Sequence, residues 1–121
     1  MKARILIVED EALVSWSLKI LLVREGYTVL GPVSSGADAI ASLEEQPDVI
    51  LMDIQLTGPM DGVDAAKTIA ALSTAKIIFT TGYTDGFMTE RARSVQPYAI
   101  LHKPIATKDL LAELTACLTD R

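Results

Sequence analysis

The chain contains few of the residues that mark several large classes of protein. Its single cysteine, Cys117, excludes a disulfide within the chain and fits a reducing compartment. Its 11 lysines and arginines are outnumbered by 16 acidic residues, and the net charge of −5 disfavours direct binding to nucleic acid. The apolar runs are too short for a membrane span, and the run before Glu9 is too short for a signal peptide. These absences predict a cytoplasmic protein that binds neither nucleic acid nor a membrane.

Apolar residues, by contrast, are abundant, at 50% of the chain, which is enough for one domain with a substantial core. The runs at residues 5–8, 49–52 and 77–79 show no polar alternation, a pattern typical of parallel strands buried on both faces. After the first run, a helical period predicts a helix over about residues 12–25. Its core-facing stripe comprises Val14, Leu18, Leu21 and Leu22.

Weaker signals complete an alternation of strands and helices over residues 1–121. Residues 27–30 are expected to form a strand that the breaker Gly31-Pro32 ends, followed by a helix over residues 37–43. Further helices are expected over about residues 63–70, 84–96 and 110–118, and that at 84–96 has only a thin apolar stripe including Phe87. Five such units joined by right-handed crossovers predict a flavodoxin-like, doubly wound α/β fold, with a five-stranded parallel sheet of order 2-1-3-4-5.

Polar side chains follow the predicted strands at the point where each strand ends. Glu9 and Asp10 follow the first strand, Asp53 the third and Thr81 the fourth. Lys103 follows a further apolar run that ends at Leu101 and is expected to form the fifth strand. Because the carboxyl ends of parallel strands share one edge of the sheet, these side chains are expected to meet in one crevice. Three acids, a hydroxyl and an ammonium suit a divalent cation and a phosphoryl group.

Five motifs in this order resemble the receiver domain of two-component response regulators, and the resemblance covers essentially the whole chain. They are Glu9-Asp10, Met52-Asp53-Ile54, Met60-Asp61-Gly62, Thr81-Gly82 and Lys103-Pro104. Residues 79–83, Phe-Thr-Thr-Gly-Tyr, also look like a Phe-Ala-Thr-Gly-Tyr variant found in single-domain receivers of alphaproteobacteria. The resemblance implies a cis bond between Lys103 and Pro104.

The resemblance implies that Asp53 is a phosphoacceptor, phosphorylated by the phosphohistidine of a histidine kinase or a histidine phosphotransfer protein. A carboxylate oxygen can attack phosphorus and hold the group as an acyl phosphate. The altered surface then signals to a downstream protein until hydrolysis removes the group. Such a chain is not a conventional enzyme, since it catalyses only its own phosphoryl transfer and autodephosphorylation.

The other site residues follow from the same resemblance and from their chemistry. Lys103 would supply a fixed positive charge, and the Thr81 hydroxyl a hydrogen bond, to the phosphoryl oxygens. The cofactor would be Mg²⁺, a hard cation that takes oxygen ligands. Its ligands would be the carboxylates of Glu9, Asp10 and Asp53 and the backbone carbonyl of Gln55.

Two other functional classes share parts of this pattern. A flavodoxin-like cofactor-binding module has the same sheet order, but its phosphate loop should be rich in Ser, Thr and Gly, unlike residues 9–13. A phosphatase of the haloacid dehalogenase type also forms an aspartyl phosphate, but it needs an Asp-x-Asp motif on the first strand, which residues 8–11 lack. A degenerate receiver that only binds partners is disfavoured because the acceptor, acids, Thr and Lys are all present.

The chain departs from the family pattern at three places, the first of which is Glu9, where Asp is also common. The loop after the acceptor has one residue more than in the commonest receivers and carries Thr57 where proline is usual. Ile100 occupies the position of the usual aromatic switch; Tyr98 is expected on the same face of its strand, and Tyr83 is a candidate substitute. In the family, the side chains at the positions of Gln55 and Tyr83 flank the path of the attacking water.

Several residues also have simpler interpretations. Asp10 could cap the first helix, and Asp61 is expected to cap the third. His102, the one histidine, is expected at a strand end beside the site rather than as a phosphodonor.

A second apolar row lies on the first predicted helix and comprises Leu13, Trp16 and Ile20. Two interpretations remain open. The row could pack against the helices that carry the donor histidine, with Trp16 as an aromatic anchor. Alternatively, Leu13 and Ile20 could reach the margin of the core and leave only Trp16 exposed.

Overall fold

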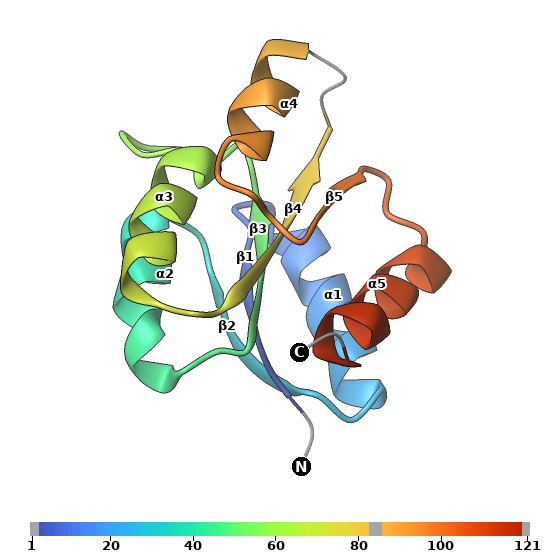
Figure 1. Cartoon of the computed structure of the whole chain (residues 1–121). Helices are drawn as coiled ribbons and strands as arrows, with labels where there is room; N and C mark the ends of the chain where they lie inside the picture. The colour runs from blue at the N-terminus through green and yellow to red at the C-terminus, as the bar shows by residue number, and fades with distance from the viewer. Residues whose placement is uncertain (1–2, 83–85, 120–121) are drawn as a thin grey trace.

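The computed structural model describes residues 3–82 and 86–119, which form one parallel sheet covered by helices (Figure 1). The elements, in chain order, are β1 (Arg4–Val8), α1 (Ala12–Arg24), β2 (Thr28–Val33), α2 (Gly36–Ala41), a 3-10 turn η1 (Ser42–Glu45), β3 (Val49–Asp53), α3 (Gly62–Leu72), β4 (Lys76–Thr81), α4 (Gly86–Arg93), β5 (Ala99–His102) and α5 (Thr107–Thr119). The strands pair in parallel in the order β2-β1-β3-β4-β5, which confirms the predicted sheet.

Both faces of the sheet are buried, which explains the unbroken apolar strands. On one face, Leu6, Ile50 and other strand residues pack under α2, α3 and α4. On the other face, Ile7 and Leu51 pack under α1 and α5. Figure 1 shows α2 and α3 on one side of the sheet and α1 and α5 on the other. Because successive strand residues point to opposite faces, each central strand contributes to both clusters.

The prediction that Gly31-Pro32 ends the second strand is wrong. β2 runs through both residues to Val33, and its ladder with β1 shifts register on the way. Gly31 has a positive φ of 78°, a conformation that favours glycine. β2 is an edge strand, where a proline without an N–H is tolerated. The extension brings Val33 to the end of the sheet, where its carbonyl accepts a 3.0 Å hydrogen bond from the N–H of Glu9.

The predicted helices are present, but α4 differs from the prediction in its C-terminal end and in which side chains it buries. α4 spans Gly86–Arg93 and so ends three residues before the predicted end at residue 96. Phe87 is 70% exposed and does not belong to the apolar stripe, whereas Ala92 is buried. Residues 84 and 85 of the predicted helix lie outside the described residues. Within residues 3–82 and 86–119, no helix combines the length and hydropathy that crossing a membrane requires.

The expectation that Tyr98 shares a face with Ile100 is also wrong. Ile100 packs with the cluster under α2, α3 and α4, whereas Tyr98 packs with the cluster on the opposite face. Strand alternation begins at Ala99, the first residue of β5, so it does not extend to Tyr98. The Tyr98 ring lies instead beside the ammonium of Lys76, 5.4 Å from the ring centroid. Tyr98 therefore does not substitute for the aromatic switch residue whose usual position is occupied here by Ile100.

Candidate functional site

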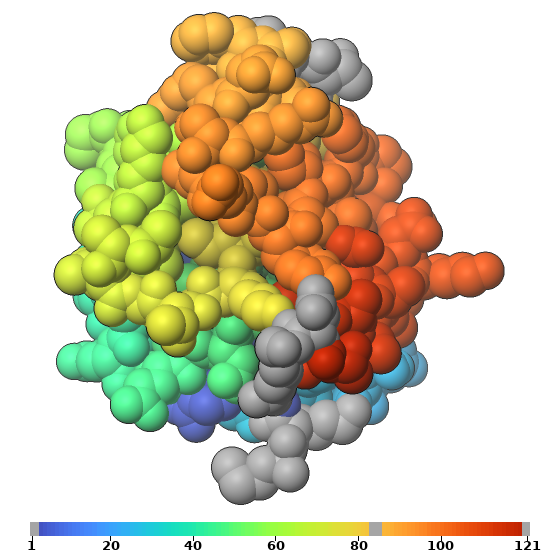
Figure 2. Space-filling model, in the orientation of Figure 1, coloured from blue at the N-terminus to red at the C-terminus, as the bar shows by residue number. Residues whose placement is uncertain are grey.

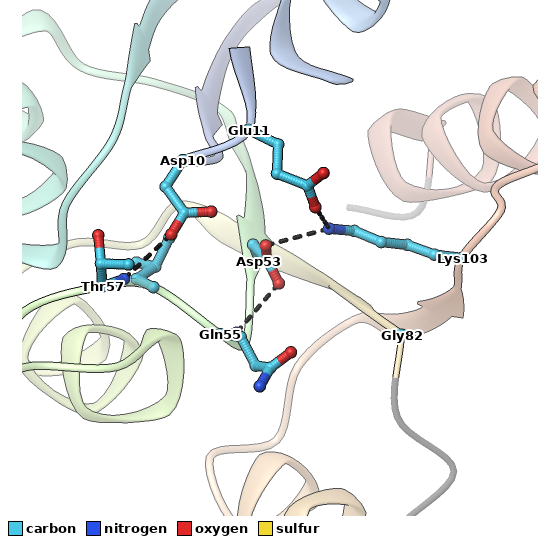
Figure 3. A pocket seen from close by; sticks show the side chains of 8 residues that line it. Asp10, Glu11, Asp53, Gln55, Thr57, Gly82 and Lys103 are labelled. Carbon is cyan, nitrogen blue, oxygen red and sulfur yellow. Dashed lines mark hydrogen bonds and ion pairs between the residues drawn. The ribbon is translucent and has the colours of Figure 1, made fainter. Parts of the chain in front are cut away.

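The carboxyl ends of β1, β3, β4 and β5 meet at one edge of the sheet and line an open cavity (Figure 3). Asp53 is the last residue of β3, Glu9 follows β1 and Lys103 follows β5. In the β3–β4 ladder, Asp53 pairs with Thr80, the residue before Thr81. Side chains that are up to 94 positions apart in sequence therefore lie in hydrogen-bond contact.

A central ion-pair group joins Lys103 to two buried carboxylates. The Nζ of Lys103 lies 2.9 Å from Oε1 of Glu9 and 3.0 Å from Oδ2 of Asp53. A third carboxylate, that of Glu11, lies 3.9 Å from the same nitrogen and is mostly exposed. The other oxygen of Asp53 accepts a 3.0 Å hydrogen bond from the backbone N–H of Gln55. Both carboxylate oxygens of Asp53 are thus fixed in the free protein.

These contacts and the burial of the site control its ionisation. Burial raises the pKa of Asp53 to about 6, and the nearby charge of Glu9 adds to this, while Lys103 and the Gln55 N–H oppose it. Burial alone would lower the pKa of Lys103, but hydrogen bonds to Glu9 and Asp53 outweigh that effect and raise it. Lys103 therefore remains a cation at neutral pH, whereas Asp53 loses its proton at a higher pH than an ordinary carboxyl does.

Three carboxylates lie close enough together to hold a metal ion. Glu9, Asp10 and Asp53 each offer an oxygen, and these oxygens all lie within 4.8 Å of one another. A set of carboxylate oxygens at the mouth of an open cavity suits a hard divalent cation such as Mg²⁺. Asp10 does not cap α1, because Glu11 occupies the N-cap position and no side chain makes a capping bond. Its Oδ2 accepts a 3.1 Å hydrogen bond from the N–H of Thr57.

Thr81 ends β4 and is buried at the same edge of the sheet. Its carbonyl accepts a 2.7 Å hydrogen bond from the N–H of Lys103, which holds the ends of β4 and β5 side by side. Gly82, the next residue, lines the cavity, and Tyr83 lies outside the described residues. The bond between Lys103 and Pro104 is cis, and His102 is the exposed last residue of β5.

Asp61 caps α3, as predicted, through a reciprocal capping box with Asp64. The guanidinium of Arg91 on α4 contacts both acids, at 2.8 Å from Asp61 and 3.2 Å from Asp64. In the space-filling view, α3 and α4 lie next to each other at the surface (Figure 2). Burial would raise the pKa of Asp61, but its hydrogen bond from Arg91 outweighs this and lowers it. No local pattern predicts this contact, because nothing marks Arg91 among the charged residues of α4.

The second apolar row on α1 is exposed along its whole length. Leu13 is 84% exposed, Trp16 61% and Ile20 44%. The interpretation in which Leu13 and Ile20 reach the margin of the core is therefore wrong. The row begins at Leu13, two residues after Glu11 of the cavity wall, so it starts beside the site.

Comparisons with known proteins show which family this chain resembles. The profile of the response regulator receiver domain matches residues 5–115. Over 109 residues, the chain is 38% identical to the transcriptional regulatory protein PdtaR of Mycobacterium tuberculosis, covering 89% of this chain and 53% of that protein. Over 120 residues, it is 32% identical to the phyllosphere-induced regulator PhyR of Methylorubrum extorquens, covering 98% of this chain and 44% of that protein. The chain thus spans about half the length of these curated relatives.

The fold also resembles that of solved receiver structures. The signal receiver domain of a modulated diguanylate cyclase from Desulfovibrio desulfuricans has a TM-score of 0.93 to this chain and 36% sequence identity. The similarity covers 99% of this chain and 96% of that one.

Proposed function

This chain belongs to the family of response regulator receiver domains, and we propose that it accepts a phosphoryl group on Asp53 from a phosphohistidine. The donor would be a histidine kinase or a histidine phosphotransfer protein. The observation that carries the proposal is the contact of 3.0 Å between Lys103 and Asp53, in a cavity that two further acids border. A small acyl-phosphate donor should phosphorylate the wild-type protein and leave Asp53→Asn unmodified.

In the proposed transfer, a carboxylate oxygen of Asp53 forms a bond to phosphorus while the bond from phosphorus to the imidazole nitrogen breaks. The imidazole leaves with the electron pair of that bond, and the product is an acyl phosphate. Catalysis of this kind rests on positioning and on neutralising charge. Lys103 supplies one positive charge beside the acceptor, and the end of β4 brings the Thr81 hydroxyl to the same edge as a donor to a phosphoryl oxygen.

Mg²⁺ is the proposed cofactor, and the residues present fit it. The carboxylates of Glu9, Asp10 and Asp53 would hold the ion, together with the backbone carbonyl of Gln55. When bound, the ion supplies positive charge that lowers the repulsion between three carboxylates and an incoming phosphoryl group. Lys103 alone cannot balance these acids, since it is one cation among Glu9, Asp10 and Asp53.

The reaction would end by hydrolysis of the acyl phosphate, so the chain acts on itself rather than as a conventional enzyme. Gln55, whose side chain is exposed at the cavity, and Tyr83 are proposed to flank the attacking water. Between phosphorylation and hydrolysis, an altered surface would signal to a protein target. We place these events in the cytoplasm, and the motif at residues 79–83 further favours the alphaproteobacterial single-domain type of receiver.

The exposed row of α1 is the proposed docking surface for the histidine-bearing partner. An apolar row of Leu13, Trp16 and Ile20 that begins beside the cavity would hold a partner within reach of Asp53. Exposed apolar side chains in a contiguous row commonly mark protein interfaces, and Trp is a frequent anchor residue. The partner would bury this row while its phosphohistidine enters the cavity.

A further inference from the structure

Asp10 is held from a distant part of the chain. Its Oδ2 accepts a 3.1 Å hydrogen bond from the backbone N–H of Thr57, which lies 47 residues away in the loop between β3 and α3. Figure 3 shows the other carboxylate oxygen of Asp10 turned toward Asp53. The hydrogen bond therefore fixes one oxygen and leaves the second directed into the acidic group.

Each of the three acids in this group has at least one oxygen held by an N–H or an ammonium. Glu9 accepts hydrogen bonds from Lys103 and from the backbone N–H of Glu11. Asp53 accepts from Lys103 and from the backbone N–H of Gln55. Asp10 differs from both, because it is only half-buried and makes no contact with Lys103 in the ion-pair group. Its orientation therefore depends on the loop that carries Thr57.

We propose that the backbone N–H of Thr57 is a positioning group for Asp10, which it pre-orients as a ligand for a divalent cation. The inference rests on the proposed metal site and adds the group that prepares it. Hydrogen bonds to the outer oxygen of a ligand fix its direction and commonly account for a substantial part of metal affinity. Proline, which is usual at this position in the commonest receivers, has no N–H, so this contact is available to the present chain through Thr57.

The contact also links the cation to the loop between β3 and α3. One oxygen of Asp10 accepts the Thr57 hydrogen bond, so a cation held by the other oxygen would favour that contact and would in turn be favoured by it. A cation that instead bound both oxygens of Asp10 would compete with the N–H of Thr57 for Oδ2 and would weaken the loop contact.

Amide hydrogen exchange of the wild-type protein separates these two arrangements. We expect the Thr57 amide to exchange at least about threefold more slowly in saturating Mg²⁺ than in EDTA, because the cation restrains its acceptor. An amide that exchanges at the same rate or faster in Mg²⁺ would overturn the proposal. This measurement needs no variant, so it is unaffected by any substitution that fails to fold.

A matched pair of variants tests the affinity directly, with Mg²⁺ binding followed by calorimetry on the unphosphorylated protein. Thr57→Ala keeps the N–H and should bind Mg²⁺ within about twofold of wild type, whereas Thr57→Pro removes the N–H and should bind about tenfold more weakly. Equal affinities in a folded Thr57→Pro would overturn the positioning role alone. Absence of Mg²⁺ binding by wild type would overturn the proposed metal site, and the role of Thr57 with it.

Discussion

The main chain of Gly62 lies directly against the carbonyl group of Asp53. A Cβ atom on Gly62 would overlap the Asp53 carbonyl oxygen and lie 2.8 Å from the Cα of Ile54. The N–H of Gly62 also donates a 2.8 Å hydrogen bond to the carbonyl of Ile54. The first turn of α3 is therefore docked on the end of the strand that carries the proposed phosphoacceptor.

Gly62→Ala should destabilise the protein by roughly 3 kcal/mol or more, because the new methyl meets backbone atoms that cannot move aside as a side chain would. The free energy of unfolding in urea measures this. Gly86→Ala is the control, since a Cβ there meets no atom within 4 Å among the described residues. Its effect should stay within about 1 kcal/mol. Similar losses for the two variants would show that the close contact at Gly62 is relieved by movement.

Lys103→Gln should slow phosphorylation of Asp53 by a small acyl-phosphate donor about 100-fold, because a positive charge beside the acceptor is lost. The rate of phosphoprotein formation, followed by mass spectrometry, measures it. Lys108→Gln removes an exposed lysine of α5 and should leave the rate unchanged. A rate for Lys103→Gln close to wild type would exclude Lys103 from the reaction.

Stability should depend on pH through Asp53, whose pKa of about 6 in the folded protein lies above its ordinary value of 3.8. The folded state binds this proton more tightly than the unfolded state does. The contribution of Asp53 to stability is therefore greatest at low pH and falls as pH rises from about 4 to 6. The difference in free energy of unfolding between wild type and Asp53→Asn, measured in EDTA, should follow this trend, and a flat difference would refute it.

Mg²⁺ should restore stability that the clustered acids lose when they ionise. At a concentration 100-fold above its dissociation constant, a ligand that binds only the native state adds about 2.7 kcal/mol. Thermal unfolding at neutral pH with and without Mg²⁺ measures the effect. A melting temperature that does not change on addition of Mg²⁺ would count against a metal site at Glu9, Asp10 and Asp53.

Trp16→Ala should slow phosphoryl transfer from the cognate phosphohistidine protein by roughly tenfold or more, since exposed Trp residues are frequent interface anchors. Phosphorylation by a small acyl-phosphate donor should not change, because that donor needs no docking surface. Phe87→Ala, at an aromatic that is 70% exposed on α4, is the matched control and should leave both rates unchanged. Equal slowing with both donors would mean that Trp16 supports the fold and that docking occurs elsewhere.

The sequence predicted those parts of the fold that depend on local patterns. Apolar runs such as residues 5–8 and 49–52 indicate buried parallel strands because burial on both faces removes polar alternation. The convergence of Asp53 and Lys103 followed from the rule that parallel strands share their carboxyl edge. The breaker assigned to Gly31-Pro32 was wrong because tolerance of proline depends on whether a strand lies at the edge, which a local pattern does not show.

Contacts that depend on loop conformation or on how two helices dock could not be predicted in this way. The N–H of Thr57 meets Asp10 across 47 residues, and Arg91 meets Asp61 across 30. Neither pair has a recurring spacing or a shared motif, because loop conformation and helix docking bring them together. The one signal was the Thr at position 57 in place of proline, which restores a backbone donor beside the site.

The proposed role of Asp53 as phosphoacceptor can be measured directly on the intact protein. Wild-type protein and Asp53→Asn are each treated with a small acyl phosphate and Mg²⁺, and the intact mass of each is then compared. We expect one added phosphoryl group on wild type, lost again on treatment with hydroxylamine as an acyl phosphate should be, and none on Asp53→Asn. Retention of the added group in a folded Asp53→Asn, or a wild-type protein that takes up no phosphoryl group, would show that Asp53 is not the phosphoacceptor.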